Sequence, residues 1–527
     1  MWAAATPPSE EQRRAGLVAF LLVPVLATGL AAGALRLAEH GDQPPPHVER
    51  SYVLEPAGGT EQRLIPSPAR PDPAAAVVTV CSPSGPVAAT ACPPDTLTSP
   101  PEPAPPPAPA APPVAAPQAP PSNPAAAALA NLINARLADP RLAGTTVGLS
   151  VWVEGLGEVA GHNADLPLTP ASNQKLFTAM GALSLIPQTD RLVTEVRATG
   201  TQEGRVLNGD LFLVGGGDPT LNAKGPHSLD DLAAAVKARG IDEVRGALVG
   251  DESRYDTVRG APGWLPQHVP VFIGPLSALV VDRNQLRPDA EYAANPLPGT
   301  LPYFRAALLR AGVRVLGPNV AAPAPDGSAV LAGLGSPTVG ELVGEMLNQS
   351  DNLIAEVLVK EVGYRHRRSP GSGGDGGETH RAGRPAPGST AGGLAAINEA
   401  VAKLGVPITG VAADGSGLSR EDRRSAREWR SLLQAVQAQP WAERLVGSLP
   451  LAARNGTLAR RFGRTAAEAN VRAKTGWIDE ARSLSGYLTT AGGRPVVFSV
   501  IVNGTTPTSP ALNALDTLVA AIAADRS

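Results

Sequence analysis

The pattern of apolar and polar positions predicts an ordered region that begins near Pro124 and continues to the C-terminus. Apolar residues spaced three and four apart predict a helix over 125–139, and the run 145–154 predicts a strand that turns at 155–157 into a second strand. Three apolar segments near the C-terminus predict successive antiparallel strands, followed by a helix over about 510–524. We therefore expect the first and last strands to meet in one sheet.

Between these ends the pattern predicts an insertion of different character. Residues 191–335 mix short strands with helices at 228–240 and 301–312, which is typical of a domain of mixed α and β type. The main domain then consists of 125–190 and 336–527. Its other predicted helices follow Pro170, lie on both sides of Ser350, cover 392–405 and surround Trp429–Val436.

The N-terminal segment predicts a membrane anchor. Residues 15–35 are apolar and uncharged, and as a helix they would be about 31 Å long, close to the roughly 30 Å hydrocarbon core. Arg13 and Arg14 favour a cytoplasmic tail over 1–14. The alternative is a signal peptide cleaved near Ala32–Ala34, which would release a secreted protein. Both interpretations place the folded region outside the cytoplasm.

Residues 36–124 predict a disordered spacer, because a segment this rich in Pro and Ala cannot bury enough apolar surface to fold. Cys81 and Cys92 lie in it, and a disulfide and two free thiols both remain open. The basic, Gly-rich stretch 365–390 predicts a disordered surface loop.

Charge and composition exclude several classes of function. A net charge of only −3 argues against a nucleic-acid partner. The 7 His are scattered and do not form the clusters with Cys or Glu that a zinc site needs, so we expect no metal. We also expect no cofactor. The predicted folded region contains no Cys, which excludes a cysteine nucleophile.

Ser172 and Lys175 stand at the start of a predicted helix with the spacing Ser-x-x-Lys. Residues three apart share a helix face, so the lysine amine can reach the serine hydroxyl. Serine needs a base to become a nucleophile, and lysine serves as that base only when burial or a nearby cation keeps its amine neutral. Alone, the pair is common and more typical of a serine that caps a helix and a solvated first-turn lysine.

Ser350, Asp351 and Asn352 fall between two predicted helices. As catalytic residues, Ser350 would pass a proton towards a leaving amine and Asn352 would donate its amide to the substrate, while Asp351 would brace the loop. As structural residues, Ser350 or Asp351 would only cap the second helix.

Lys474, Thr475 and Gly476 end a predicted strand. Lys474 would supply positive charge for a substrate carboxylate and help to keep Lys175 neutral. Gly476 would let a ligand approach the strand edge closely. The alternative is an ordinary junction between a strand and a turn.

The three motifs follow the order S-x-x-K, S-D-N, K-T-G of enzymes that acylate an active-site serine. Each is short enough to arise by chance in 527 residues, but all three in this order and in fitting local context are specific. They predict one catalytic constellation, in which the main-chain N–H groups of Ser172 and Trp477 form an oxyanion hole.

The chain resembles low-molecular-mass penicillin-binding proteins of class C, the D-alanyl-D-alanine carboxypeptidase/endopeptidase type. The resemblance covers about residues 125–527 and includes the segments GGGDPTL, PLSALVVDRN, SDNLIAE, DGSGLSR and SLSGY. It implies an α+β fold, the penicillin-binding and serine β-lactamase-like transpeptidase fold, in which helices flank a five-stranded antiparallel sheet. It also implies a domain inserted between the first and second motifs.

The resemblance further implies cleavage of the terminal D-Ala-D-Ala bond of peptidoglycan stem peptides, or of cross-links between them, and acylation by β-lactams. The catalytic residues it implies are Ser172, Lys175, Ser350, Asn352 and Lys474, and the substrate-binding residues are Thr475, Gly476, Trp477 and Asp218. Asp218 would pair with a free amine on the substrate's diamino acid; the alternative is an Asp-Pro turn that only stabilises a loop.

The spacing supports this branch of the family, because Ser172 and Ser350 are 178 residues apart, a far longer gap than in class A β-lactamases. Two departures limit what the resemblance implies. Trp477 stands where a Thr or Ser often follows the third motif, and the insertion is shorter than in relatives with two inserted domains. A β-lactamase-like hydrolase and a non-catalytic penicillin-binding sensor of the cell wall remain the alternatives. Carboxypeptidase versus endopeptidase preference and the oligomeric state also stay open.

Overall fold

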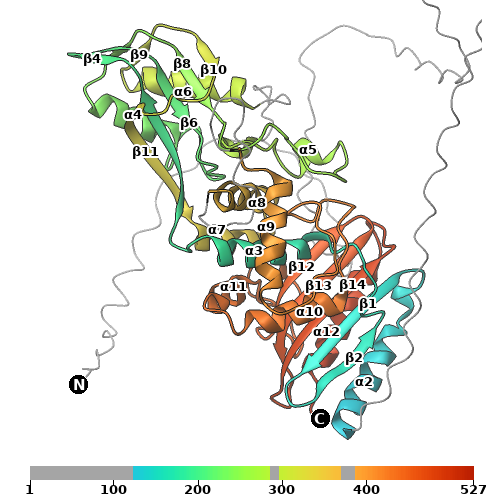
Figure 1. Ribbon diagram of the computed structural model, residues 1–527. Helices are drawn as coiled ribbons and strands as arrows, with labels where there is room; N and C mark the ends of the chain where they lie inside the picture. The colour runs from blue at the N-terminus through green and yellow to red at the C-terminus, as the bar shows by residue number, and fades with distance from the viewer. Residues whose placement is uncertain (1–122, 285–295, 369–385) are drawn as a thin grey trace, which may run out of the picture. The chain divides into compact units, whose positions relative to one another are not determined.

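The computed structural model describes residues 123–284, 296–368 and 386–527, all within the unit Ser99–Ser527 (Figure 1). The predictions for the tail, the anchor, nearly all of the spacer, both cysteines and most of the 365–390 loop lie outside the described residues. Within the described ranges, no helix is both long and apolar enough to cross a membrane.

One antiparallel sheet joins the two ends of the described chain. Its strands are β1 (Thr146–Val153), β2 (Gly157–His162), β12 (Arg472–Ile478), β13 (Ala481–Thr489) and β14 (Pro495–Asn503). Their order is β12-β13-β14-β1-β2, so the N-terminal hairpin pairs with the last strand of the chain. The expectation that the first and last strands meet in one sheet is confirmed.

Alternate side chains of β14 pack into two different hydrophobic cores, as expected for a strand that is buried on both faces. Phe498 and Val500 pack on one face with α2 (Pro124–Leu137) and α12 (Ala511–Ala523). Ile501 belongs to the core of the helical layer on the other face. The helices of that layer are α3 (Gln174–Leu185), α7 (Val339–Gln349), α8 (Asn352–His366), α9 (Thr390–Ala402), α10 (Ala426–Val436) and α11 (Ala442–Ser448).

The chain between α3 and α7 forms two further sheets around a core of their own, to which α4 (Leu229–Ala238) and α6 (Leu297–Arg310) contribute. The larger sheet contains β3 (Arg191–Ala198), β6 (Leu211–Val214), β8 (Leu248–Asp251), β10 (Asn319–Ala321) and β11 (Ala329–Thr338), in the order β10-β8-β6-β3-β11. The smaller sheet contains β4 (Thr201–Glu203), β5 (Val206–Asn208), β7 (Glu243–Val244) and β9 (Arg314–Val315).

The long periodic segments form the helices and strands that their patterns predict, with boundaries shifted by a few residues. The pattern did not predict β4, β5, β7, β9, β10, β11 or α11. Most of these strands have only two or three residues, too few to show an alternation. The alternation in β11 is interrupted by Gly333, Gly335 and Pro337.

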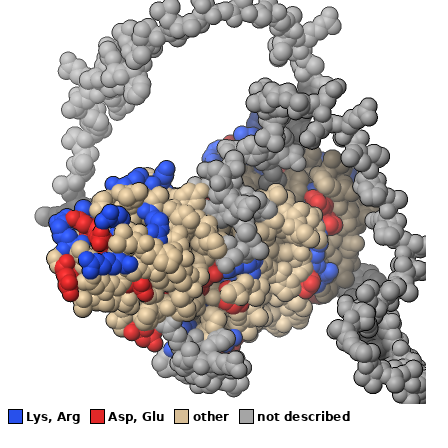
Figure 2. Space-filling view, turned by 90° about the horizontal axis from the view of Figure 1, so that it is seen from above, with Lys and Arg blue, Asp and Glu red and all other residues tan. Residues whose placement is uncertain are grey.

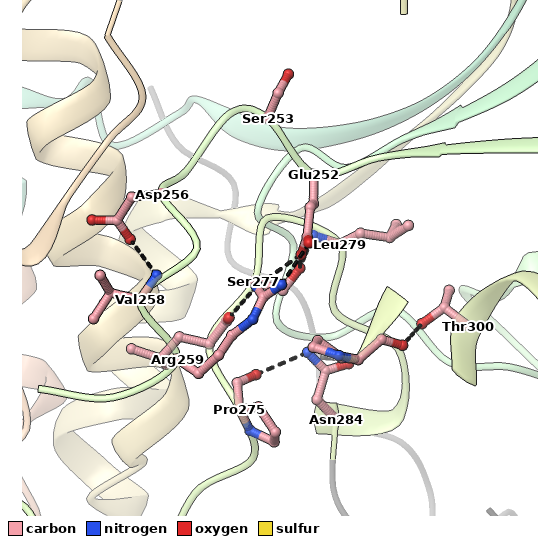
Figure 3. A network of polar contacts seen from close by, with 12 residues as sticks. Glu252, Ser253, Asp256, Val258, Arg259, Pro275, Ser277, Leu279, Asn284 and Thr300 are labelled. Carbon is pink, nitrogen blue, oxygen red and sulfur yellow. Dashed lines mark hydrogen bonds and ion pairs between the residues drawn. The ribbon is translucent and has the colours of Figure 1, made fainter. Parts of the chain in front are cut away.

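Polar contacts hold residues 252–284, the described part of the connection between β8 and α6 of the inserted region (Figure 3). Glu252 accepts hydrogen bonds from Arg259 at 2.8 Å and from the Ser277 hydroxyl at 2.5 Å. Asn284 donates to the carbonyl of Pro275 at 3.0 Å. This described part of the connection is therefore held by its own side chains.

The same connection is tied to α8 by two ion pairs. Arg254 binds Glu361 at 2.6 Å, and Lys360, which is almost completely buried, pairs with Asp256. Because α8 begins in the second motif, the inserted region is attached to the helix that carries this motif.

Acidic and basic side chains alternate on the surface of the inserted region, at the end that carries β4 and β9 (Figure 2). Arg205 pairs there with Asp242, and Arg314 pairs with Glu243 at 2.5 Å. These exposed pairs largely neutralise one another, so this end is not a single-sign binding surface.

Candidate active site

Ser172 lies in a short 3-10 turn (Ala171–Asn173) that leads directly into α3. Asn173 anchors the turn to the sheet by donating its amide to Ser485 Oγ on β13 at 2.6 Å. Ala171 has a φ of 47°, a left-handed conformation that a non-glycine residue keeps only when its surroundings hold it. The turn therefore presents the half-buried Ser172 in a fixed position.

Lys175, on the first turn of α3, is completely buried beside this serine. Its Nζ lies 2.9 Å from Ser172 Oγ, 2.7 Å from Asn352 Oδ1 and 2.6 Å from the carbonyl oxygen of Ser416. The amide and carbonyl oxygens can only accept hydrogen bonds. A neutral amine gives its N–H groups to them and turns its lone pair towards the Ser172 hydroxyl, which is the arrangement that a general base requires.

The surroundings favour this neutral form. Burial lowers the pKa of Lys175 to about 8, although nearby carboxylates, Asp414 foremost, oppose the shift. Burial also lowers the pKa of Lys474 well below its ordinary value, and the charge of Lys175 lowers it further. The charge of Lys175 thus opposes protonation of Lys474. That Lys474 in turn helps to keep Lys175 neutral stays a prediction.

The second motif forms the turn between α7 and α8. Ser350 ends α7 with a φ of 61°, and its Oγ accepts a hydrogen bond from Lys474 Nζ at 2.9 Å. Asp351 caps α8 by accepting from the N–H of Ile354 at 3.0 Å, and its other oxygen pairs with Arg283 of the inserted region. Asp351 therefore braces the turn from both sides.

Asn352 uses both ends of its amide within the protein. Its Oδ1 accepts from Lys175, and its Nδ2 donates at 3.1 Å to the carbonyl of Phe272, which follows the short helix α5 (His268–Val271). An amide nitrogen carries two N–H groups, so one donor remains for a ligand. The substrate contact of Asn352 stays a prediction.

The third motif lies on β12, the outer strand of the sheet. Lys474 is completely buried and bridges Ser350 Oγ and the carbonyl of Thr475, to which it donates at 2.8 Å. Thr475 donates its hydroxyl to Thr457 at 2.8 Å. The structure thus brings Ser172, Lys175 and Asn352 into one contact set and Ser350 and Lys474 into a second.

Gly476 is packed closely against neighbouring parts of the chain. A Cβ on Gly476 would lie 2.1 Å from Ser483 Oγ and 2.7 Å from the carbonyl oxygen of Pro170. The space that a side chain needs is therefore filled by the turn before Ser172 and by β13. Glycine at this position therefore leaves room for the turn that carries Ser172. That it also lets a ligand approach the strand edge closely stays a prediction.

Residues 129–299 and 294–524 match the D-Ala-D-Ala carboxypeptidase 3 (S13) family. The chain belongs to this family. It is 32% identical over 459 residues to a D-alanyl-D-alanine carboxypeptidase of Actinomadura sp., covering 72% of this chain and 81% of that protein. It is also 30% identical over 424 residues to the carboxypeptidase DacB of Mycolicibacterium smegmatis, covering 76% of this chain and 84% of that protein.

Solved structures show the same mixed α/β penicillin-binding fold. Penicillin binding protein 4 of Haemophilus influenzae superposes with a TM-score of 0.65 at 21% identity, over 74% of this chain and 99% of that chain. The same protein complexed with a β-lactam gives a TM-score of 0.58 at 23% identity, over 73% of this chain and 98% of that chain.

Three residues of this S13 site were not singled out from the motifs. Ser416 contributes the carbonyl that binds Lys175, and Asp414 holds the same loop by accepting from the N–H of Gly417 at 2.6 Å. Glu356 accepts from the N–H of Ser416 at 2.8 Å. The available signal was its position four residues after Asn352, which places both side chains on one face of α8.

The predicted oxyanion hole remains a prediction in this family member. Trp477 lies on β12 opposite Arg482 of β13, and the guanidinium of Arg482 stacks 4.0 Å from the centre of the indole ring. This stacking holds the Trp477 side chain against the sheet. It also explains how an indole is accommodated directly after the third motif.

Asp218 has no hydrogen bond or ion pair to the three motifs among the described residues. Its buried carboxylate accepts from the N–H and the hydroxyl of Thr220 at 2.8 and 2.7 Å, and its second oxygen lies 2.6 Å from His227 Nε2. Both oxygens are therefore used inside the inserted region. These contacts favour the alternative left open above, a turn that stabilises the loop.

We expect Asp218→Asn to lower the melting temperature by about 3 °C while changing kcat/KM by less than about 3-fold for peptides with a free side-chain amine. The hydrogen bond with Asp218 raises the pKa of His227. The pair therefore stabilises the fold fully at pH values below the pKa that this histidine has in the unfolded chain. The stabilisation is lost as the pH rises through the pKa that it has in the folded protein. The melting difference from wild type should accordingly shrink in alkaline buffer. A loss of tenfold or more confined to amine-bearing peptides, with penicillin acylation intact, would instead establish substrate contact.

Proposed function

We propose that this chain is a serine D-Ala-D-Ala carboxypeptidase that acts on peptidoglycan stem peptides through an acyl-enzyme. The observation that carries the proposal is the contact of the Lys175 amine with the Ser172 hydroxyl at 2.9 Å, while its other two contacts are acceptors. Membership of the S13 family supports the same reaction.

In this mechanism Lys175 takes the proton as Ser172 Oγ attacks the carbonyl carbon of the penultimate D-alanine. The tetrahedral intermediate collapses, the C–N bond breaks, and the leaving amine receives a proton through Ser350, whose hydroxyl is hydrogen-bonded to Lys474. Water then attacks the ester with Lys175 again as base, which releases the shortened peptide and restores Ser172. Lys474 also supplies the positive charge for the terminal carboxylate of the substrate.

The test is to give the purified full-length protein a stem pentapeptide ending in D-Ala-D-Ala and a labelled penicillin. We expect catalytic release of D-alanine and a stable penicillin adduct. Rapid turnover of penicillin without D-alanine release would favour a β-lactamase-like hydrolase. An adduct without turnover of either compound would favour a sensor of the cell wall, and a cross-linked muropeptide dimer would test endopeptidase activity.

We also propose that residues 15–35 anchor the protein in the cell membrane with the enzyme outside the cytoplasm, which would place it beside its peptidoglycan substrate. Fractionation of cells should find the full-length chain in the membrane, resistant to extraction by salt. A soluble protein with a mature N-terminus near Leu35 would show cleavage instead.

A further inference from the structure

Helix α8 is linked to Lys175 in two ways, once directly and once through the loop that contains Gly415 and Ser416. At its first residue, Asn352 Oδ1 accepts a hydrogen bond from Lys175 at 2.7 Å. One turn later, Glu356 Oε1 accepts from the N–H groups of Gly415 and Ser416 at 3.0 and 2.8 Å. The carbonyl of Ser416 returns to Lys175 Nζ at 2.6 Å, so the contacts form a closed ring.

The loop in this ring has little freedom to move. A Cβ on Gly415 would lie 2.5 Å from Val359 of α8 and 3.2 Å from Thr178 of α3, so the loop main chain is pressed between the two helices. Thr178 also donates its hydroxyl to the carbonyl of Gly415 at 2.7 Å. Glu356 is the side chain through which α8 holds the N–H side of this loop.

The carboxyl group of Glu356 is completely buried and only partly satisfied. Its Oε2 has no hydrogen-bond partner among the described residues, a costly arrangement for an anion. Burial, and next the charge of Asp414, raise the pKa of Glu356 to about 8. The other titratable groups around this carboxyl and Lys175 are Asp422 of the same loop, Asp351 of the α7–α8 turn and Lys474 of β12.

We propose that Glu356 is a positioning residue for the serine–lysine pair and that it works as a neutral carboxylic acid. In this form it holds the loop whose Ser416 carbonyl orients the Lys175 amine. It does so without placing a negative charge beside that amine. This inference rests on the proposed acyl-enzyme function and names a residue that the three motifs do not contain.

The neutral form matters because an anionic Glu356 stabilises the ammonium form of Lys175. When the doubly protonated pair loses one proton, either the lysine becomes the free base or the glutamate becomes an anion beside an ammonium. Only the first product can activate Ser172. Glutamine keeps the carbonyl acceptor for both N–H groups and removes the second product.

The experiment measures acylation by a fluorescent penicillin against pH in the full-length protein. We expect Glu356→Gln to stay within about 3-fold of wild type at its optimum and to move the acid limb of the profile to lower pH by about half a unit or more. Glu356→Met, which offers no acceptor, should be slower by about 100-fold across the range.

Glu361→Gln is the matched control, because Glu361 is also a buried carboxylate of α8. Its carboxylate binds Arg254 and Arg365 and does not contact Lys175. It should lower the melting temperature and leave the acid limb in place. Acylation by Glu356→Gln that is slower by about 30-fold or more at every pH, with unchanged melting, would overturn the proposal, since it would show that the anion is needed.

A second readout does not depend on activity. An acid whose folded pKa is raised makes the fold less stable as pH increases between the unfolded and the folded pKa, here from about pH 4 to about pH 8. The melting temperature of wild type should therefore fall by about 3 °C more than that of Glu356→Gln across this window. Equal changes would overturn this proposal alone, whereas absent acylation and absent D-alanine release in wild type would overturn the proposed function.

Discussion

Ser172→Ala is expected to abolish both β-lactam labelling and release of D-alanine, while the protein stays folded. The hydroxyl is the only functional group of this half-buried side chain, and its Oγ is hydrogen-bonded to the Lys175 amine. Without it no ester forms, and the rate should fall to the background of the assay. Intact-mass spectrometry after penicillin treatment measures this directly, as one adduct on wild type and none on the variant.

Ser184→Ala provides the control for the loss of a hydroxyl on the same helix, because Ser184 is exposed near the end of α3. It should take up one adduct at the wild-type rate. An adduct of the same mass that persists in Ser172→Ala would assign the nucleophile to another residue and remove the basis of the proposed mechanism.

Lys175→Arg is expected to slow acylation by about 10³-fold or more. The guanidinium keeps the charge but remains protonated, so it cannot accept the Ser172 proton. The wild-type amine becomes a free base because burial lowers the pKa of Lys175 to about 8. Stopped-flow acylation by a chromogenic β-lactam measures the loss, and wild type should show a rate that rises as pH approaches that value.

Lys360→Arg is the corresponding control, since Lys360 is equally buried on the neighbouring helix α8 but pairs with Asp256. We expect it to acylate at close to the wild-type rate. Near-normal acylation by Lys175→Arg would exclude this lysine as the base and would direct attention to Lys474, the other buried amine of the site.

Local sequence was sufficient for the long elements and for the motifs. The helix after Pro170 and the strand 145–154 were predicted because their apolar residues recur with the period of the element itself. The short strands β7 and β9 escaped prediction because two residues have no period. Their pairing is decided by neighbours far away in the chain.

The amino-acid sequence by itself determined the order of the three motifs and the family, and it predicted the catalytic residues, because these depend on residue identity and local spacing. Only the tertiary structure decided what surrounds them. It brought the carbonyl of Ser416 into contact with Lys175, which is 241 residues away in the sequence. It likewise brought the hydroxyl of Ser350 into contact with Lys474, 124 residues away. It also gave the Asp218 carboxylate its hydrogen-bond partners, Thr220 and His227. Burial and through-space contacts set a side chain's pKa and partners, and both arise from packing between distant segments.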